Sequence, residues 1–508
     1  MLSYVYCAAL MGIDASIVKV EVDVRTQGLP NWSMVGMLET AVKEAKDRVS
    51  SAIRNSGYSL PNRQTLINLS PADLKKSGAH YDLAIAIALL TAVGACKPAH
   101  DKNYLIAGEL SLTGSVLPIS GTLLMALAAK QHDLDGIIVP SANAWEARLA
   151  DSGDIIAVDT LAQAVSTLNG EKKITALPLP NPKRDQSIAT DLSEVRGQPF
   201  AKRGLEIAAA GGHNIALKGP PGTGKTMLAE RLPSILPPLT HDEAIEVLKI
   251  RSCHGLLTGT SSLPTERPFR APHHSASYAG LVGGGGAGRA KLGEISLAHN
   301  GVLFLDEMAE FKKDVLEVLR QPLESGYVRI VRSGISVSYP ARFMLVAAFN
   351  PCKCGYFTHP KRPCICSAGD VRRYRSKLSG PLLDRIDLHV EVGPPPHEAL
   401  LTSSEEEQSD KIRERVFAAR ARQKTRYGHP GATNANLSGR AILKRCALAK
   451  DERNFLKEAA QRIHLTGRSM HRVIKVARTI ADLEGRDAIT ISHLAEALQF
   501  RPTLRDFE

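Results

Sequence analysis

Alternating apolar and polar positions near the start of the chain predict an α/β fold there. Between residues 13 and 24, Lys19, Glu21 and Asp23 alternate with Val18, Val20, Val22 and Val24, a pattern typical of a half-buried strand. After a turn-rich stretch at 28–31, helical spacing predicts a helix from Thr40, the candidate cap, with the apolar positions Val42, Ala45, Val49, Ala52 and Ile53. Further strand and helix patterns continue to about residue 168, so we expect a first α/β domain.

Short apolar runs separated by helical stretches mark a second region. The runs at 214–218, 301–305 and 343–348 are continuous and brief, which favours buried parallel strands of a doubly wound sheet. Before this region, residues 171–190 hold three prolines and no apolar periodicity, which predicts a linker.

The remainder of the chain has a helical pattern. Its clearest apolar face consists of Val473, Val476, Ala477, Ile480 and Leu483. We therefore predict an α/β domain at 1–170, a linker at 171–190, a doubly wound α/β domain at 191–395 and a helical domain at 396–508.

Size and composition agree with several domains and with a location in the cytoplasm. A chain of 508 residues exceeds one hydrophobic core. No apolar run reaches the roughly 20 residues of a membrane span, and the N-terminus, interrupted by Asp14, does not have the pattern of a signal peptide. An excess of 64 Lys+Arg over 52 Asp+Glu gives a formal charge of +12, which favours polyanionic partners such as DNA without identifying one.

A glycine-rich loop predicts a nucleotide site. It follows an apolar run, precedes a helical pattern and reads Gly219, Pro220, Pro221, Gly222, Thr223, Gly224, Lys225 and Thr226. Backbone N–H groups of such a loop close on phosphate oxygens, the lysine reaches the β and γ phosphates, and the threonine binds Mg²⁺. The loop therefore predicts binding of ATP with Mg²⁺.

Polar residues after two later apolar runs complete a hydrolytic site. Asp306 is expected to hold Mg²⁺ together with Thr226, and Glu307 to orient and deprotonate the attacking water. Asn350 follows the run at 343–348 and is a candidate for positioning that water, although it also fits a simple turn before Pro351. In this order the motifs predict ATP hydrolysis.

Four of the eight cysteines cluster in two Cys-x-Cys pairs: Cys352, Cys354, Cys364 and Cys366. In a reducing compartment such a cluster points to a metal before disulfides, and four thiolates suit tetrahedral Zn²⁺. Free reduced thiols and a redox role remain alternatives.

Two segments are candidates for contact with DNA. The first, 277–291, is rich in glycine and carries Arg289 and Lys291; the second, 327–338, alternates around Ser-Gly like a β-hairpin and carries Arg329 and Arg332. Solvated loops with incidental charge are the alternative. The arginines between 413 and 426 accompany an apolar helical stripe and favour a solvated or inter-subunit face over a DNA site, and the adjacent His273 and His274 are poorly placed to chelate one ion together.

Longer motifs resemble a known family. They are Arg-Pro-Phe-Arg-Ala-Pro-His-His at 267–274, the stretch 293–307, Asn-Pro-Cys-Lys-Cys-Gly at 350–355, and Ser-Gly-Pro-Leu-Leu-Asp-Arg-Ile-Asp at 379–387. Over essentially its whole length the chain resembles the AAA+ ATPases, in the magnesium-chelatase-like branch that includes the ComM (YifB) proteins. This resemblance implies a sensor role for Asn350, an arginine finger supplied to the neighbouring subunit by Arg385, and a second sensor at Arg468 with Arg472 as its substitute. A local ion pair of Arg385 with Asp384 or Asp387 is the alternative.

The resemblance also carries expectations about assembly and activity. A finger acting in trans implies a ring, for this family a hexamer. The N-terminal region resembles the Lon protease catalytic domain at 108–121 but has Tyr81-Asp82 and Thr122–Met125 in place of the nucleophile and lysine, so we expect no proteolysis. The implied activity is that of a DNA helicase that promotes branch migration in recombination during natural transformation, while a chelatase-type motor for metal insertion and a protein-remodelling ATPase are the alternatives.

Overall fold

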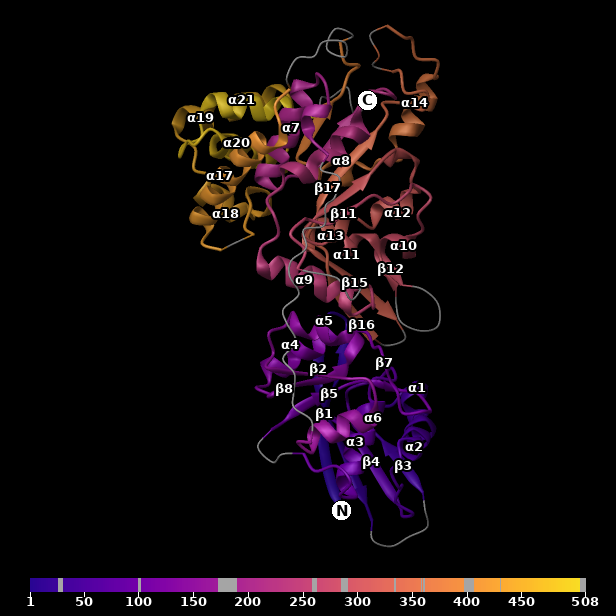
Figure 1. The fold of residues 1–508 in the computed structure, drawn as a ribbon. Coiled ribbons are helices and arrows are strands. Elements are labelled where there is room, and N and C mark those ends of the chain that lie inside the picture. Colours follow the sequence, from indigo (N-terminus) through magenta and orange to yellow (C-terminus); the bar gives the residue numbers. More distant parts are fainter. Residues whose placement is uncertain are drawn as a thin grey trace. The chain divides into compact units, whose positions relative to one another are not determined.

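The computed structural model divides the chain into two compact units (Figure 1). It describes residues 1–25, 31–98, 102–171, 190–257, 263–284, 291–332, 335–357, 359, 361–396, 406–429 and 431–502. The first unit contains residues 1–184, 241–264 and 331–339, and the second contains 185–240, 265–330 and 340–508. Nearly all of the predicted linker, 172–189, lies outside the described residues.

A mixed sheet with the strand order β3-β4-β2-β1-β5-β8-β9 forms the centre of the first unit. Strands β1, β2 and β4 are antiparallel neighbours, whereas β1, β5, β8 and β9 pair in parallel. Its strands are β1 (Leu2–Met11), β2 (Asp14–Val24), β3 (Trp32–Val35), β4 (Thr65–Ser70), β5 (Tyr104–Ile106), β8 (Gly136–Pro140) and β9 (Asp154–Val158). Strands β6 (Glu109–Leu110) and β7 (Val116–Leu117) form a separate antiparallel pair. Strand β2 confirms the prediction from alternation, because its even-numbered valines from Val18 to Val24 are all buried.

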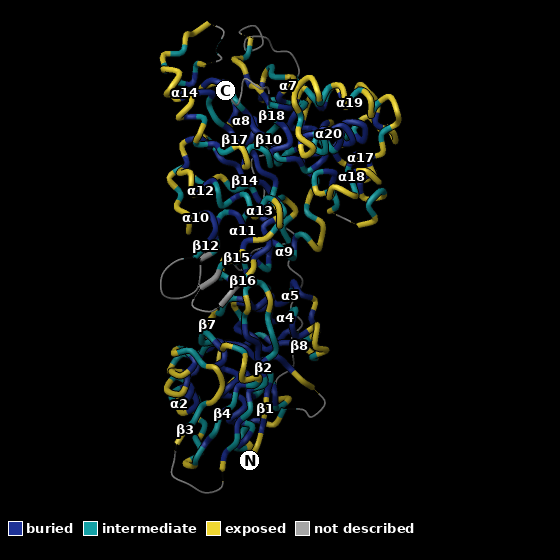
Figure 2. The backbone as a smooth tube through the Cα atoms, turned by 180° about the vertical axis from the view of Figure 1, so that it is seen from behind, coloured by how far each residue is buried: buried dark blue, intermediate teal, exposed yellow. Residues whose placement is uncertain are grey.

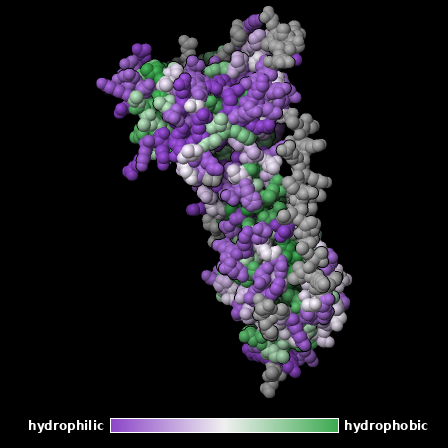
Figure 3. All heavy atoms as spheres, turned by 60° about the vertical axis from the view of Figure 1, so that its left-hand side comes forward, coloured by the Kyte–Doolittle hydropathy of each residue, from purple (hydrophilic) through white to green (hydrophobic). Residues whose placement is uncertain are grey.

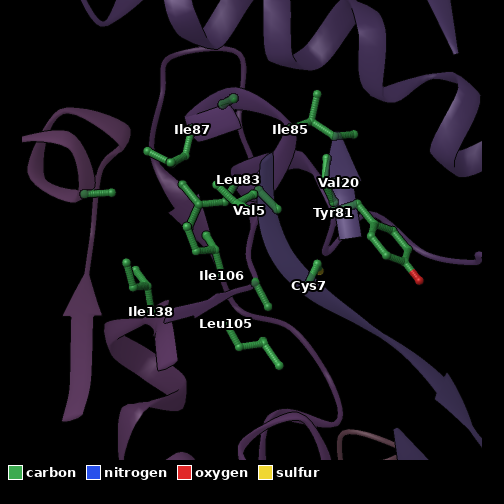
Figure 4. Packing of buried hydrophobic residues seen from close by; sticks show 14 of the residues in the cluster. Val5, Cys7, Val20, Tyr81, Leu83, Ile85, Ile87, Leu105, Ile106 and Ile138 are labelled. Atoms are coloured by element: carbon green, nitrogen blue, oxygen red, sulfur yellow. The ribbon is translucent and has the colours of Figure 1, made fainter. Parts of the chain in front are cut away.

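Helices pack on this sheet and complete its core. They are α1 (Thr40–Lys43), α2 (Ala45–Asn55), α3 (Asp82–Ala92), α4 (Thr122–Gln131), α5 (Ala144–Arg148) and α6 (Leu161–Leu168). Leu83 and Ile85 of α3 lie among Val5, Val20 and Leu105 of the strands (Figure 4). The predicted apolar face from Val42 to Ile53 is buried, but the helix is interrupted at Glu44, and Thr40 is its first residue, not its cap; Glu39 occupies the cap position.

Two segments from the middle of the chain belong to the first unit. Helix α9 (His241–Ser252) packs on α4, and its Leu248 is buried in the core of this unit. The backbone N–H of Gly121 donates to the carbonyl of Ser252 at 2.9 Å, and the Ser252 hydroxyl donates to the carboxylate of Glu146 at 2.5 Å. Most of strand β16 (Ile335–Pro340) is the second such segment, and its Tyr339 is buried near His254.

A five-stranded parallel sheet forms the centre of the second unit. Its order is β11-β14-β17-β10-β18, with β10 (Ile215–Lys218), β11 (Phe269–Arg270), β14 (Val302–Leu305), β17 (Met344–Phe349) and β18 (Leu388–Glu391). Strands β10, β14 and β17 confirm the three short apolar runs as buried strands. The fold is thus the predicted α/β class with a doubly wound sheet.

Shorter elements surround this sheet. The helices are α7 (Pro199–Gly211), α8 (Lys225–Ile235), α10 (Tyr278–Val282), α11 (Glu294–Leu297), α12 (Lys313–Glu317), α13 (Arg320–Ser325), α14 (Ala368–Arg375) and α15 (Gly380–Leu383). The two-stranded pairs are β12 (Gly283–Gly284) with β13 (Lys291–Leu292) and β15 (Tyr327–Arg332) with β16. The second pair confirms the predicted hairpin.

A helical bundle completes the second unit. It contains α17 (Ser409–Tyr427), α18 (Gly439–Arg445), α19 (Lys450–Arg462), α20 (Gly467–Leu483) and α21 (Ile491–Gln499), and α17 and α20 pack against α7. The predicted apolar face of α20 is buried from Val473 to Ile480. Helix α19, in contrast, is largely exposed (Figure 2). Hydrophilic side chains dominate the bundle's outer face in Figure 3. None of the helices that the structure describes has the length and apolar character of a membrane span.

The packing of α9 predicts that residues from the middle of the sequence stabilise the first unit. We expect Leu248→Ala to lose about 2–5 kcal/mol, because it removes a buried side chain and leaves a cavity. Hydrogen exchange of α4 amides should therefore accelerate. Leu256→Ala is the matched control, since Leu256 is exposed on the same segment. Unchanged protection of α4 in Leu248→Ala would contradict this assignment.

Candidate nucleotide site

The glycine-rich loop lies between the end of β10 and the start of α8. Gly222 and Gly224 have φ values of 77° and 88°, in the left-handed region that glycine adopts without strain. A Cβ at Gly219 would lie 2.0 Å from the carbonyl oxygen of Val392, which follows β18. The loop therefore needs glycine at 219 for close approach and at 222 and 224 for its turns.

Lys225 is buried at the centre of the loop. Its Nζ donates to the carbonyls of Gly219 at 2.8 Å and Pro220 at 2.7 Å, and to Oδ1 of Asn350 at 3.2 Å. An ammonium group has three donors, so all three are used within the protein. Burial lowers the pKa of Lys225 to about 8, although Asp306 and Glu307 act in the opposite direction.

The residues that follow β14 face the same loop. The Thr226 hydroxyl donates to Oδ2 of Asp306 at 2.7 Å, and the backbone N–H of Glu307 donates to Oδ1 of Asp306 at 2.9 Å. Glu307 has a φ of 49°, a strained value for a non-glycine residue. Its carboxylate is exposed and lies 3.5 Å from Nδ1 of His274.

Sheet topology explains why these residues meet. Strand β17 lies between β10 and β14, and in a parallel sheet the carboxyl ends of neighbouring strands share one edge. The loop after β10, Asp306 after β14 and Asn350 after β17 therefore converge. A hydroxyl and a carboxylate 2.7 Å apart offer the oxygen ligands that Mg²⁺ prefers.

The arginines assigned by resemblance contact a different set of acids. Arg385 forms an ion pair with Glu324, and Arg468 reaches the same carboxylate at 4.0 Å. Asp384 and Asp387, the alternative partners proposed for Arg385, instead lie 3.5 Å from the guanidinium of Arg472. The structure thus gives Arg385 a local partner, but one that the sequence analysis did not name.

A buried polar chain connects the helical bundle with the parallel sheet. His213 bonds through Nδ1 to Asp387 and through Nε2 to Thr479 of α20, at 2.9 and 2.8 Å. Burial lowers the pKa of Arg472, which approaches Asp387 from α20. Sequence reasoning missed His213 and Glu324, because partners up to 266 positions apart leave no local signal.

The four clustered thiols converge. All four sulfur atoms lie within 4.8 Å of one another, and the separations of Cys352 from Cys354 and of Cys354 from Cys364 are 3.3 and 3.5 Å. A disulfide needs about 2.05 Å, whereas a Zn–S distance of about 2.3 Å places tetrahedral ligands about 3.8 Å apart. Cys352 is buried, and Cys366 is partly exposed.

The candidate DNA residues are only partly described. Arg289 and the side chains of Lys291 and Arg332 lie outside the described residues, whereas Arg329 is exposed on β15. On α17, Arg415 pairs with Glu206 and Glu407, and Arg426 pairs with Asp482. These arginines of α17 therefore serve contacts within the unit.

The residues at the Lon-like positions have structural roles in the first unit. Asp82 is buried and accepts two bonds from the Arg48 guanidinium at 2.7 and 3.1 Å, and burial raises its pKa to about 6 against the effect of Arg48. Tyr81 is buried in the core, and Leu123 to Met125 are core residues of α4.

The parallel sheet and the loop at its edge define a P-loop nucleotide-binding protein. Family models for magnesium chelatase subunit ChlI match residues 191–400 and, for its C-terminal part, 406–501, and a further ChlI model matches 20–143. The YifB protein of Salmonella typhimurium is 44% identical, with 98% of this chain and 97% of that protein covered, and the competence protein ComM of Haemophilus influenzae is 43% identical, with 99% and 98% covered. The chain therefore belongs to the magnesium-chelatase-like AAA+ family that includes the ComM and YifB proteins.

A more distant relative matches less than half of the chain. The chloroplastic magnesium-chelatase subunit ChlI of Nicotiana tabacum is 26% identical over 209 residues, 41% of this chain and 43% of that protein. Full-length similarity thus lies with the ComM and YifB proteins.

The lowered pKa of Lys225 predicts that binding of MgATP depends on pH. Phosphate charges favour the protonated lysine, so its pKa rises in the complex and binding takes up a proton above pH 8. We expect the affinity of a fluorescent ATP analogue to fall about tenfold between pH 7 and pH 9. Lys225→Arg is the control, because a guanidinium stays charged throughout this range. Equal affinity of the wild-type protein at both pH values would contradict the prediction.

Proposed function

We propose that this protein is a ring-forming ATPase that moves on DNA and promotes branch migration during recombination, and that it acts in the cytoplasm. The observation that carries the ATPase part is the convergence of Lys225, Thr226, Asp306 and Asn350 at one edge of the sheet. The relative named as a competence protein, similar over its whole length, supports a role in the uptake and recombination of DNA.

ATP hydrolysis would use residues of this edge. Backbone N–H groups of Gly222, Thr223 and Gly224 and the Lys225 ammonium hold the phosphates. Lys225 gives up its bonds to the Gly219 and Pro220 carbonyls as it does so. When bound, Mg²⁺ would neutralise part of the negative charge of the phosphates. Thr226 and Asp306 hold it, Glu307 takes the proton of the attacking water, and Asn350 orients that water.

The ring is proposed from the arginines. Arg385 completes the site of the neighbouring subunit, most simply in a hexamer, and Arg468, with Arg472 as its substitute, acts from the helical bundle on the site of its own chain. In the isolated chain both Arg385 and Arg468 contact Glu324. Because Glu324 is partly exposed, a nucleotide phosphate is a stronger partner for either guanidinium than this carboxylate.

Contact with DNA is proposed at the hairpin β15–β16 and at the glycine-rich segment. Arg329 is exposed. Together with Arg332, Arg289 and Lys291 it would offer positive charge to the phosphates of a DNA strand in the centre of the ring. The excess of basic residues supports a polyanionic partner.

Branch migration tests the proposal directly. We expect the purified protein to hydrolyse ATP faster with single-stranded DNA and to move a three-way DNA junction. Lys225→Ala should bind DNA but lose movement by at least 100-fold, since it removes the phosphate contact. Arg385→Ala should be inactive alone and regain partial turnover when mixed with Lys225→Ala, because each supplies what the other lacks.

Two results would replace the proposal. An ATPase rate that ignores DNA but responds to a metal-binding partner subunit would indicate a chelatase motor. Stimulation by unfolded polypeptide in place of DNA would indicate a protein-remodelling ATPase.

We further propose that Cys352, Cys354, Cys364 and Cys366 hold a structural Zn²⁺. The sulfur separations suit a tetrahedral ion. The cysteine segment also lies against the phosphate loop, because a Cβ at Gly355 would be 2.5 Å from Cδ of Pro221. The ion would therefore stiffen the segment that connects Asn350 with the loop.

Metal analysis checks the zinc site. We expect one Zn²⁺ per chain in the wild-type protein and almost none in the Cys352→Ser, Cys364→Ser double variant. This variant should also bind ATP several-fold more weakly, because the segment behind Pro221 loosens. Cys446→Ala is the control, since Cys446 is buried elsewhere in the same unit. A wild-type protein without zinc would leave the four residues as reduced thiols.

A further inference from the structure

A hollow in the first unit combines positive charge with aromatic surface. It has a volume of about 700 Å³ and is lined by the start of β3, one side of α2 and the segment between α2 and β4, which lie side by side in Figures 1 and 2. Ligand sites commonly have volumes of about 300–1,000 Å³. The hollow is therefore large enough for a ligand, and it belongs wholly to one unit.

Three cations line this hollow. Lys46 and Arg54 come from α2, and Arg63 comes from the segment before β4. All three are exposed, and no lining residue is acidic. Among the described residues, none forms an ion pair or hydrogen bond with these three side chains. Two other cations of the unit, Arg48 and Lys102, are by contrast paired with Asp82 and Asp154. Unpaired charge at one place favours an anionic ligand.

The spacing of the cations suits a chain of phosphates. Lys46, Ser50 and Arg54 are four residues apart, so they form one stripe along α2. At 1.5 Å per residue, Lys46 and Arg54 are about 12 Å apart along the helix. A stacked nucleic-acid strand rises about 3.4 Å per nucleotide. The stripe is therefore long enough to contact several successive phosphates of a strand. A single small anion is too short to contact both ends of it.

Two aromatic rings add a surface for bases. Trp32 and Tyr58 both line the hollow and are only partly buried, with their remaining surface packed against the core. Rings fixed in this way can stack with unpaired bases, worth about 1–3 kcal/mol per base. Cations together with half-exposed rings are the combination found in sites for single strands.

We propose that this hollow, defined by Trp32, Lys46, Arg54, Tyr58 and Arg63, binds a short stretch of single-stranded nucleic acid. The phosphates contact the three cations, and bases stack on the two rings. This site lies in the first unit and needs neither ATP nor the residues of the nucleotide site. It therefore goes beyond the proposed motor function and can be tested apart from it.

Tryptophan fluorescence isolates this site. The chain has two tryptophans, so in a Trp145→Phe protein the emission comes from Trp32 alone. We expect an oligothymidylate to quench this emission in a saturable manner without ATP. In the Lys46→Ala, Arg54→Ala, Arg63→Ala variant of the same protein, the affinity read from the quenching should fall at least tenfold. A plot of the logarithm of the affinity against the logarithm of the salt concentration should also become less steep in this variant. Each lost phosphate contact lowers the slope by about 0.7, so the loss of three contacts lowers it by about 2.

Matched variants separate a local effect from one of net charge. Lys97→Ala, Lys102→Ala, Lys130→Ala removes the same charge from exposed positions of the same unit outside the hollow, and it should bind like the parent. Lys46→Arg, Arg54→Lys, Arg63→Lys conserves the charge and should also retain quenching. Hydrogen exchange of α2 in each variant establishes that the fold is intact.

Specific results would overturn the proposal. Binding of the oligonucleotide by anisotropy with unchanged Trp32 emission would place the strand elsewhere. Equal quenching by duplex DNA, by thymidine monophosphate or by polyglutamate would show that the hollow does not select a single strand. Quenching in a protein whose ATPase rate ignores DNA would support this site while the motor proposal fails.

Discussion

The buried ammonium of Lys225 is the interaction on which the geometry of the nucleotide site depends. A buried charge is costly unless it is hydrogen-bonded, and Lys225 meets this need with two loop carbonyls and the side chain of Asn350. These bonds join the loop after β10 to the end of β17. They also keep the cation at the place where phosphates are expected. Gly219 is essential to this arrangement because the loop passes directly beneath the carbonyl of Val392.

Polar contacts extend from this edge to the helical bundle. Arg472 and Thr479 of α20 reach Asp387 directly and through His213, and Glu324 joins Arg385 to Arg468. Arginines from the bundle and from the segment before β18 thus contact the same carboxylate, that of Glu324. A nucleotide that attracts one of these arginines changes the charge balance of the others, which is a physical route by which the bundle can sense the site.

The two units are interleaved along the chain. The backbone passes between them after residues 184, 240, 264, 330 and 339. Helix α9 contributes Leu248 to the first core, and Ser252 bonds to Glu146 there. The first unit is therefore not a simple N-terminal addition, because its core is completed by residues that lie in the sequence between segments of the second unit.

Local patterns were sufficient for much of this protein. Strand β2, the three buried strands of the parallel sheet and the apolar face of α20 follow from periodicity, since burial of one face leaves a repeat in the sequence. The phosphate loop and the cysteine pairs could also be recognised in the sequence, because such motifs consist of particular residue types at short spacing. Thr40 was wrongly assigned as a cap, since a helix start is set by backbone geometry that neighbouring residues such as Glu39 can equally adopt. Only the tertiary structure decided that Asn350 meets Lys225, that Glu324 holds two arginines, that α9 belongs to the first unit and that Trp32 lines the same hollow as Arg54 and Arg63. Each of these joins residues far apart in the chain, and such contacts arise from packing of whole elements, which no local pattern records.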